Sequence, residues 1–255
     1  MRTLTDNPIL FGAVTFVVLW LATWLGAKVL PRLVPLDEGS RAEFGVIQAA
    51  TLTLLGLIIG FTFSMATTRY DQRKNYEEDE ANAIGTAYVR AELLPAPVSA
   101  RLRPLLRAYL EQRIQFYTLT DAERLRAVDA ETSRLQGELW AAARDGARAD
   151  SSQVAALAVA SINDVLNAQG YTQAAWWNRI PVQAWMLMAA IAICSCALVG
   201  YGARSARAEA FMLPVLPLIV SIAFLLIADI ESPRSGTISI TARNLEALAQ
   251  SLRGP

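Results

Sequence analysis

Long apolar runs alternate with one polar block along this chain of 255 residues. The runs cover residues 9–30, 44–66, 181–202 and about 211–230. Each is close to the roughly 20 residues that a helix needs to cross a hydrocarbon core of about 30 Å. The only charged side chains inside them are Lys28 and Asp229, each near the end of its run, where it can reach the membrane interface. A buried helix of a soluble protein would show polar residues on every turn. The pattern therefore predicts an integral membrane protein with four transmembrane helices.

The block between the second and third runs is polar and has helical periodicity. It holds 14 Lys/Arg and 15 Asp/Glu of the 23 and 23 in the whole chain. The second run should continue as one helix to Leu94, where Pro95 and Pro97 end it. Further helices are expected over 98–118, from Thr120 or Asp121 onward, from Asp150 or Ser151 to Gly170, and over 241–252.

These elements predict an all-α membrane protein in which an antiparallel helical domain is inserted between two transmembrane hairpins. The expected parts are a first transmembrane hairpin (1–66), a helical cytosolic domain (67–180), a second transmembrane hairpin (181–230) and a short cytosolic tail (231–255). Pro214 and Pro217 are expected to kink or locally open the helix of the fourth span. With four spans, both termini and the large domain share one side. That side carries slightly more basic residues beside the membrane, which favours a cytoplasmic location.

Composition excludes several functional classes. The net charge is zero, which argues against a basic nucleic-acid binder, and the chain has no histidine for a catalytic triad, zinc site or proton shuttle. No glycine-rich phosphate loop or nucleophile elbow occurs. We therefore expect no enzyme activity, and no catalytic, cofactor or metal site.

The second span differs from the other three because it mixes hydroxyl, glycine and bulky apolar residues. One face gathers small residues that would let helices approach closely: Ala49, Thr53, Gly56, Gly60 and Thr67. Beside it runs a stripe of Leu57, Phe61, Ser64 and Thr68. Such a stripe could line a pore with a hydrophobic constriction. The alternative is that both faces pack against other helices of the same subunit.

Charged residues follow the second span directly. Arg69, Arg73 and Lys74 come first, and the acidic run 77–80 follows. Basic residues at a pore would concentrate anions and acidic ones cations, whereas an alternating run on an exposed helix is ordinarily a solvated face. We assign Ser64, Thr68, Arg69 and Arg73 to a pore mouth, and ion selectivity stays open at this point.

Two stretches of sequence resemble the bestrophin superfamily, and more closely its bacterial bestrophin-like members. The first is Gly60-Phe61 followed by Arg69-Tyr70, with a continuation over 80–88 that is similar to the bacterial pattern. The second is the stretch 230–236 after the fourth span, which resembles a Glu-x-Pro-Phe-Gly turn. The order of two spans, a helical insertion, two spans and a short tail is also similar over nearly the whole chain.

This resemblance implies an anion channel, such as one for chloride, made of five copies of the chain in the lipid bilayer of a bacterial inner membrane. The second helices would surround the pore, and a hydrophobic neck would fall at Thr53, Leu57 and Phe61. Thr53 departs from an apolar neck, because a hydroxyl there lowers the barrier to water. The acidic calcium clasp of animal bestrophins is not matched in the stretch after Gly236, so calcium gating is not implied.

Another class of function fits the same sequence. A membrane scaffold or sensor that does not conduct could use the helical domain to bind a partner, and its second span would face helices of its own subunit. A transporter would need an intramembrane charge or an inverted repeat, and the sequence shows neither.

Overall fold

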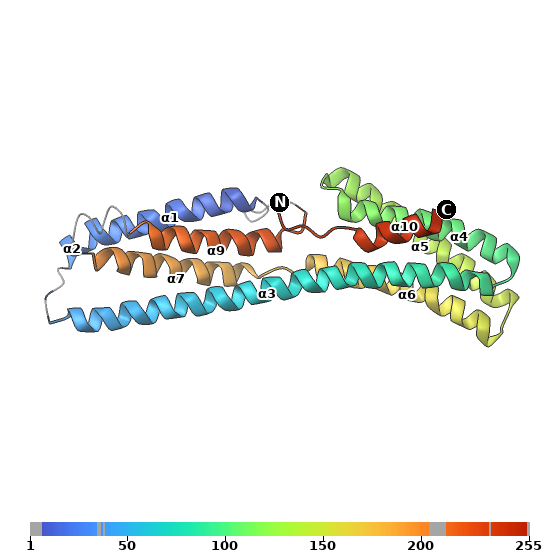
Figure 1. Cartoon of the computed structure of the whole chain (residues 1–255), viewed down its shortest axis with the longest axis horizontal. Coiled ribbons are helices and arrows are strands. Elements are labelled where there is room, and N and C mark those ends of the chain that lie inside the picture. Colours follow the sequence, from blue (N-terminus) through green and yellow to red (C-terminus); the bar gives the residue numbers. More distant parts are fainter. Residues whose placement is uncertain (1–6, 35–36, 38, 204–212, 235, 254–255) are drawn as a thin grey trace. The chain divides into compact units, whose positions relative to one another are not determined.

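The computed structural model describes residues 7–34, 37, 39–203, 213–234 and 236–253, and all regular elements among them are helices. In chain order they are α1 (Pro8–Lys28), α2 (Leu30–Leu33), α3 (Arg41–Arg90), the 3-10 turn η2 (Ala91–Leu93), α4 (Ala96–Thr118), α5 (Ala122–Ala149), α6 (Gln153–Trp177), α7 (Val182–Tyr201), α9 (Val215–Glu231) and α10 (Arg243–Arg253) (Figure 1). The predicted all-α class is confirmed. The start of the predicted fourth span, at residues 211–212, lies outside the described residues.

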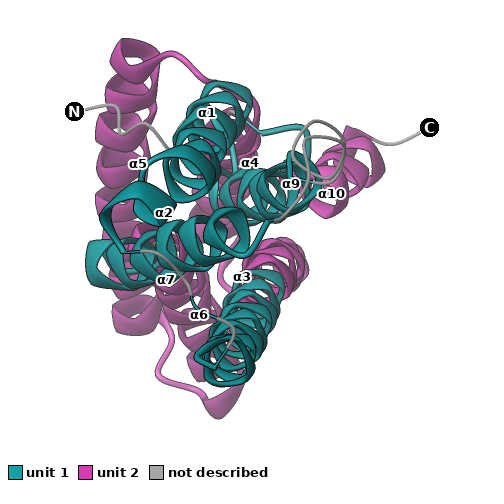
Figure 2. Cartoon of the chain, turned by 90° about the vertical axis from the view of Figure 1, so that its left-hand side faces the viewer, with its two compact units in different colours: residues 1–68, 179–239 teal, residues 69–178, 240–255 magenta. Residues whose placement is uncertain are grey.

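The chain forms two compact units, which Figure 2 draws in different colours. Unit 1 comprises residues 1–68 and 179–239, and unit 2 comprises residues 69–178 and 240–255. Helix α3 contributes its first part to unit 1 and its remainder to unit 2. The C-terminal tail is also divided between the units: its residues up to 239 belong to unit 1, and the rest, with α10, belongs to unit 2.

Membrane-spanning candidates occur in three stretches of the described chain. Helices long and apolar enough to cross a bilayer lie within Pro8–Leu33, Arg41–Leu93 and Gln153–Tyr201. Helix α9 is also strongly apolar but has 17 described residues, and the segment 204–212 before it is outside the description. A topology with four spans therefore stays a prediction.

Helix starts follow local capping chemistry that can be read from sequence. The side chain of Asn7 accepts a hydrogen bond from the Leu10 amide at 3.3 Å at the start of α1. Asp121 accepts from the amides of Glu123 and Arg124 at 3.1 and 2.9 Å at the start of α5. Both residues satisfy amides that a helix leaves without intrahelical partners.

Of two predictions about helix continuity, one stays a prediction and the other is wrong. The kink or local opening at Pro214 and Pro217 stays a prediction, because residues 204–212 lie outside the described residues. Pro214 is the N-cap of α9, and Pro217 lies in its first turn. Proline is tolerated there since the first amides of a helix have no intrahelical acceptor. Gly170 does not end α6, which continues to Trp177 and buries Thr172 and Trp176 beyond it. The tertiary burial of this last part outweighs the low helix propensity of one glycine.

Unit 1 has a core shared mainly by α1, α7 and α9. Its buried members are Leu19, Ala22, Leu55, Met188, Ala192, Cys196, Val220 and Phe224. Helices α1 and α7 approach most closely near Gly26 and Gly200. A Cβ on Gly26 would overlap the carbonyl of Ala197, and one on Gly200 would overlap the carbonyl of Thr23. The backbones can pack at this distance because both positions are glycine.

The close contact of α1 with α7 predicts a stability loss for Gly200→Ala. The added methyl group must displace the Thr23 carbonyl, which is backbone and cannot turn aside. We expect a loss of about 1–3 kcal/mol, typical of overpacking, measured by thermal unfolding in detergent. Ala190→Val adds bulk to an exposed position of the same helix and should leave the midpoint nearly unchanged. Equal midpoints for the two variants would contradict the close contact.

Unit 2 is a helical bundle around one hydrophobic core. Its fully buried large side chains include Leu102, Leu106, Tyr109, Leu110, Leu135, Leu139 and Ile162. Val154 and Leu157, two apolar residues near the start of α6, lie outside this core and are 50% and 52% exposed.

Candidate pore helix

Helix α3 is held in unit 1 along one narrow face. Between residues 44 and 68 its buried residues are Leu55, Thr62 and Ala66, which fall on one side of the helix. The Ser195 hydroxyl of α7 donates to the Thr51 carbonyl at 3.4 Å. Thus α7 supports α3 along this line (Figure 1), and most of the apolar circumference of α3 is exposed.

The predicted neck residues lie on the side of α3 opposite to its buried face. At 100° per residue, Thr53, Leu57 and Phe61 fall about 160–240° from Leu55. All three are exposed, Leu57 by 52% and Phe61 by 63%. Ser64 and Thr68 are also exposed and continue the same stripe. The structure therefore places these five residues on one surface of unit 1, and their role as neck and mouth stays a prediction.

The threonine hydroxyls of this stripe are bonded to the backbone of α3 itself. Thr53 donates to the Ala49 carbonyl and Thr68 to the Ser64 carbonyl, each at 2.9 Å. Their donors are satisfied without any partner from another helix, while the oxygen lone pairs remain on the exposed surface. The stripe thus offers polar acceptors between the bulky apolar side chains of Leu57 and Phe61.

The small-residue face of α3 is also unoccupied by described residues. A Cβ built at Gly45, Gly56 or Gly60 would have no neighbour within 4 Å. Within the described part of unit 1, these glycines therefore do not pack against another helix of the same subunit. The close approach of helices in unit 1 uses Gly26 and Gly200 instead.

The two predicted arginines of the pore mouth belong to unit 2. Arg69 is half-buried, and Arg73 is 1% exposed. The Arg73 guanidinium donates to the carbonyls of Ala175 and Asn178 at 3.1 and 3.0 Å. These carbonyls end α6, so Arg73 caps the negative end of that helix. Sequence reasoning missed this contact because the partners lie 102 and 105 residues away.

The acidic run after the second span is not a uniformly solvated face. Glu78 and Asp79 are exposed, whereas Glu77 and Glu80 are 1% and 0% exposed. Glu77 accepts from the amide and side chain of Asn244 at 2.9 and 2.6 Å and from the Leu245 amide at 3.0 Å. Its carboxylate therefore caps the start of α10.

Glu80 forms an ion pair with Arg113 in the interior of unit 2, and both side chains are fully buried. The Tyr117 and Thr172 hydroxyls each lie 3.3 Å from Glu80 Oε2. The Arg113 guanidinium also lies over the Phe116 ring, 4.4 Å from its centroid. Burial, and then the negative charge of Glu80, raise the pKa of the Tyr117 phenol above its usual value. This phenol is therefore neutral and can donate to Glu80.

The motif after α9 forms a tight turn. Asp229 is buried and accepts from the Thr237 amide and hydroxyl, each at 2.7 Å, and from the Ile238 amide at 2.9 Å. A Cβ on Gly236 would lie 2.6 Å from the Asp229 carbonyl oxygen, so the turn requires glycine there. Among the residues that the structure describes, no three or more Cys, Asp or Glu side chains are grouped so that they could hold a metal ion.

A family model for the bestrophin-like domain matches residues 13–245. The chain belongs to the bestrophin-like family. The resemblance found in the motifs at 60–70, 80–88 and 230–236 is thereby confirmed. No curated protein sequence matches this bestrophin-like chain.

Solved structures share the fold of this bestrophin-like protein at low sequence identity. A variant of a bacterial bestrophin homologue from Klebsiella pneumoniae is 14% identical with a TM-score of 0.67, covering 94% of this chain and 93% of the other. Another variant of a homologue from Klebsiella pneumoniae is 16% identical with a TM-score of 0.64, covering 96% and 97%. A structure described as a membrane protein is 16% identical with a TM-score of 0.64, covering 97% and 99%.

Proposed function

We propose that this bestrophin-like protein is one subunit of an ion channel that conducts passively through a shared pore lined by α3. Five copies would surround the pore in a bacterial inner membrane, with Thr53, Leu57 and Phe61 at the neck. The large helical domain and both termini would be cytoplasmic. Anions such as chloride are the expected ions, following the bestrophin resemblance of the Gly60-Phe61 and Arg69-Tyr70 motif.

The position of the stripe on α3 supports this proposal most strongly. In unit 1 the neck residues, Ser64 and Thr68 face away from the helix that supports α3. A scaffold whose second span packs inside its own subunit would bury them. Exposure opposite the supporting helix is what a pore-lining helix needs.

The chemistry of this stripe differs from that of a lipid-facing surface. The exposed large residues of α1 include Val14, Val17, Val18 and Leu21, which suit contact with hydrocarbon. The α3 stripe instead places three hydroxyl residues around Leu57 and Phe61. Lipid contact gives no advantage to hydroxyl oxygens, whereas a pore contains water that can donate to them.

The small-residue face gives the subunits a way to approach one another. Gly56 and Gly60 leave an open surface beside the stripe. A helix of a neighbouring copy could pack closely there, as small residues permit in membranes. This arrangement would place the stripe of each copy toward a common axis.

Cysteine accessibility tests the pore-lining role. In a background with Cys194→Ser and Cys196→Ala, Leu57→Cys should react with a charged, membrane-impermeant thiol reagent, and the reaction should block flux in liposomes. The reason is that thiolates form in water and not in hydrocarbon. The matched control is Val17→Cys on the exposed apolar face of α1, which should remain unmodified. Equal reactivity at both positions would contradict the assignment.

The mass of the intact particle separates the channel from the scaffold. We expect native mass spectrometry of the detergent-solubilised protein to give five copies of the 27.8 kDa chain. A monomer or dimer would overturn the shared pore and favour the non-conducting scaffold or sensor.

A further inference from the structure

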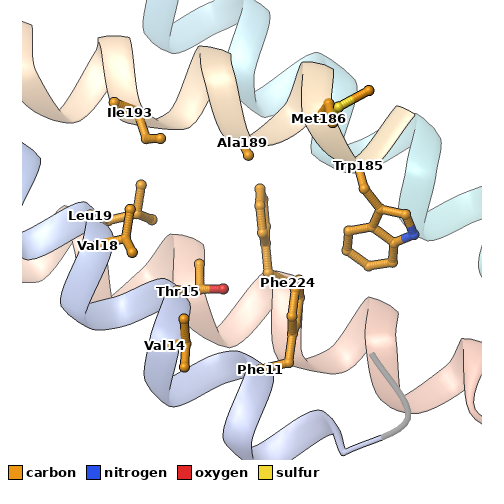
Figure 3. Close-up of a pocket in the computed structure, with 10 residues that line it drawn as sticks. All are labelled: Phe11, Val14, Thr15, Val18, Leu19, Trp185, Met186, Ala189, Ile193 and Phe224. Atoms are coloured by element: carbon orange, nitrogen blue, oxygen red, sulfur yellow. The ribbon is translucent and has the colours of Figure 1, made fainter. Parts of the chain in front are cut away.

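A groove of about 280 Å³ lies in unit 1 where α1, α7 and α9 meet. Figure 3 shows Phe224 of α9 between Ala189 of α7 and Phe11 of α1, with Trp185 at one end and Val18 and Leu19 toward the other. Ala189 contributes only a methyl group to the wall on the α7 side. Its volume is close to the lower end of small-molecule sites.

The walls of the groove are almost entirely apolar. Among the described residues, no charged side chain lines the groove, and Thr15 is the one lining residue with a hydroxyl group. The Trp185 ring packs edge-to-face against both Phe11 and Phe224, with centroids 5.2 and 6.3 Å apart. Such a lining binds water poorly, because a water molecule needs two to four polar partners. An uncharged apolar occupant matches it.

The groove opens sideways onto the exposed apolar surface of α1 and α7. Its rim residues Val14, Val18, Met186 and Ile193 are between 38% and 59% exposed. The same surface continues into Val17 and Leu187, which are also exposed. In a bilayer this surface faces hydrocarbon, so the groove is continuous with the lipid phase and not with water.

The length of the groove along α1 matches one leaflet. Its lining residues on α1 run from Phe11 to Leu19, which is about 12 Å at 1.5 Å per residue. Half of a hydrocarbon core is about 15 Å. The groove starts one turn inside the beginnings of α1 and α7, so it lies in the leaflet at those helix ends.

We propose that this groove is a specific site for one acyl chain of a bilayer phospholipid. The chain enters sideways between Val18 and Ile193 and lies against Ala189, Phe224 and Trp185. Its head group stays at the interface, at the end where α1 and α7 begin. The site depends on the membrane placement of unit 1 and not on ion conduction.

The test uses a phospholipid whose acyl chain carries a photoreactive diazirine, mixed at low content into vesicles of unlabelled phospholipid. After irradiation, peptide mass spectrometry should find the label concentrated on the rim and walls of the groove. Ala189→Leu places three extra carbons inside the groove, so labelling there should fall about tenfold, a binding loss of about 1.4 kcal/mol. Ala190→Leu, on an exposed face of α7 outside the groove, is the matched control and should label like the wild type.

A second variant still tests the site if Ala189→Leu fails to fold. Val18→Trp narrows the entrance from the exposed rim and should also reduce labelling. Label that is spread evenly over α1 and α7 and is unchanged by both Ala189→Leu and Val18→Trp would overturn the site. So would complete displacement by equimolar free oleic acid, or crosslinks from the groove to a second copy of the chain. Labelling does not require flux, so a chain that labels without conducting keeps the site while the channel proposal fails.

Discussion

Phe61→Ala should raise anion flux through reconstituted liposomes about tenfold, because a barrier lower by about 1.4 kcal/mol changes a rate tenfold. Phe61 is 63% exposed and is the largest side chain of the stripe opposite Leu55. In a ring of copies its side chains would meet at the axis and exclude water from the constriction. Truncation to a methyl group widens and wets this ring. Flux is measured by the quenching of a chloride-sensitive dye inside the vesicles.

Phe63→Ala is the matched control for this measurement. Phe63 is also exposed, by 43%, and lies on the same helix. Two residues along a helix are about 200° of rotation, so Phe63 points well away from the stripe. Its truncation should leave flux near the wild-type value. Unchanged flux in Phe61→Ala, or an equal rise in both variants, would remove Phe61 from the neck.

The helices could be predicted because their signals are local. Apolar length indicated the long membrane segments. Pro95 lies just beyond the long second helix, but α3 ends at Arg90 and not at Leu94, and Pro97 lies in the first turn of α4. The sequence limits the N-cap of α5 to Thr120 or Asp121, because an N-cap bonds amides two or three residues ahead, and Asp121 makes these bonds. Helical periodicity also places Leu57 and Phe61 on one stripe, but their exposure follows only from the structure.

The contacts around the charged segment could not be predicted because their partners are remote. Glu77 bonds residues 167 and 168 positions away, and Arg73 bonds residues more than 100 positions away. Asp79 is exposed and Glu80 is buried although they are adjacent in the chain, and a local charge pattern cannot predict this difference. Only the packing of α3 against the rest of unit 2 decides which carboxylate is buried.

Glycine spacing shows that a close helix contact is possible, but not where it forms. The second span offers Gly56 and Gly60, and the sequence suggested packing there. Within unit 1 the close contact instead uses Gly26 and Gly200, whose Cβ positions are filled by carbonyls of the opposite helix. The glycines of α3 remain open in unit 1, which is consistent with a contact between copies.

Glu80→Ala should destabilise unit 2 by about 3–5 kcal/mol, because it leaves the buried Arg113 charge without its partner. Within the described part of the chain, both hydrogen bonds of the Arg113 guanidinium run to Glu80, and both side chains are fully buried. Thermal unfolding followed by circular dichroism measures the loss of stability. The control is Asp79→Ala at the exposed neighbouring position, which should change the midpoint little.

The double variant Glu80→Leu with Arg113→Met removes both charges and should recover most of the stability, since apolar replacements of a buried pair are often tolerated. A double variant as unstable as Glu80→Ala would mean that lost packing, not the unpaired charge, causes the effect.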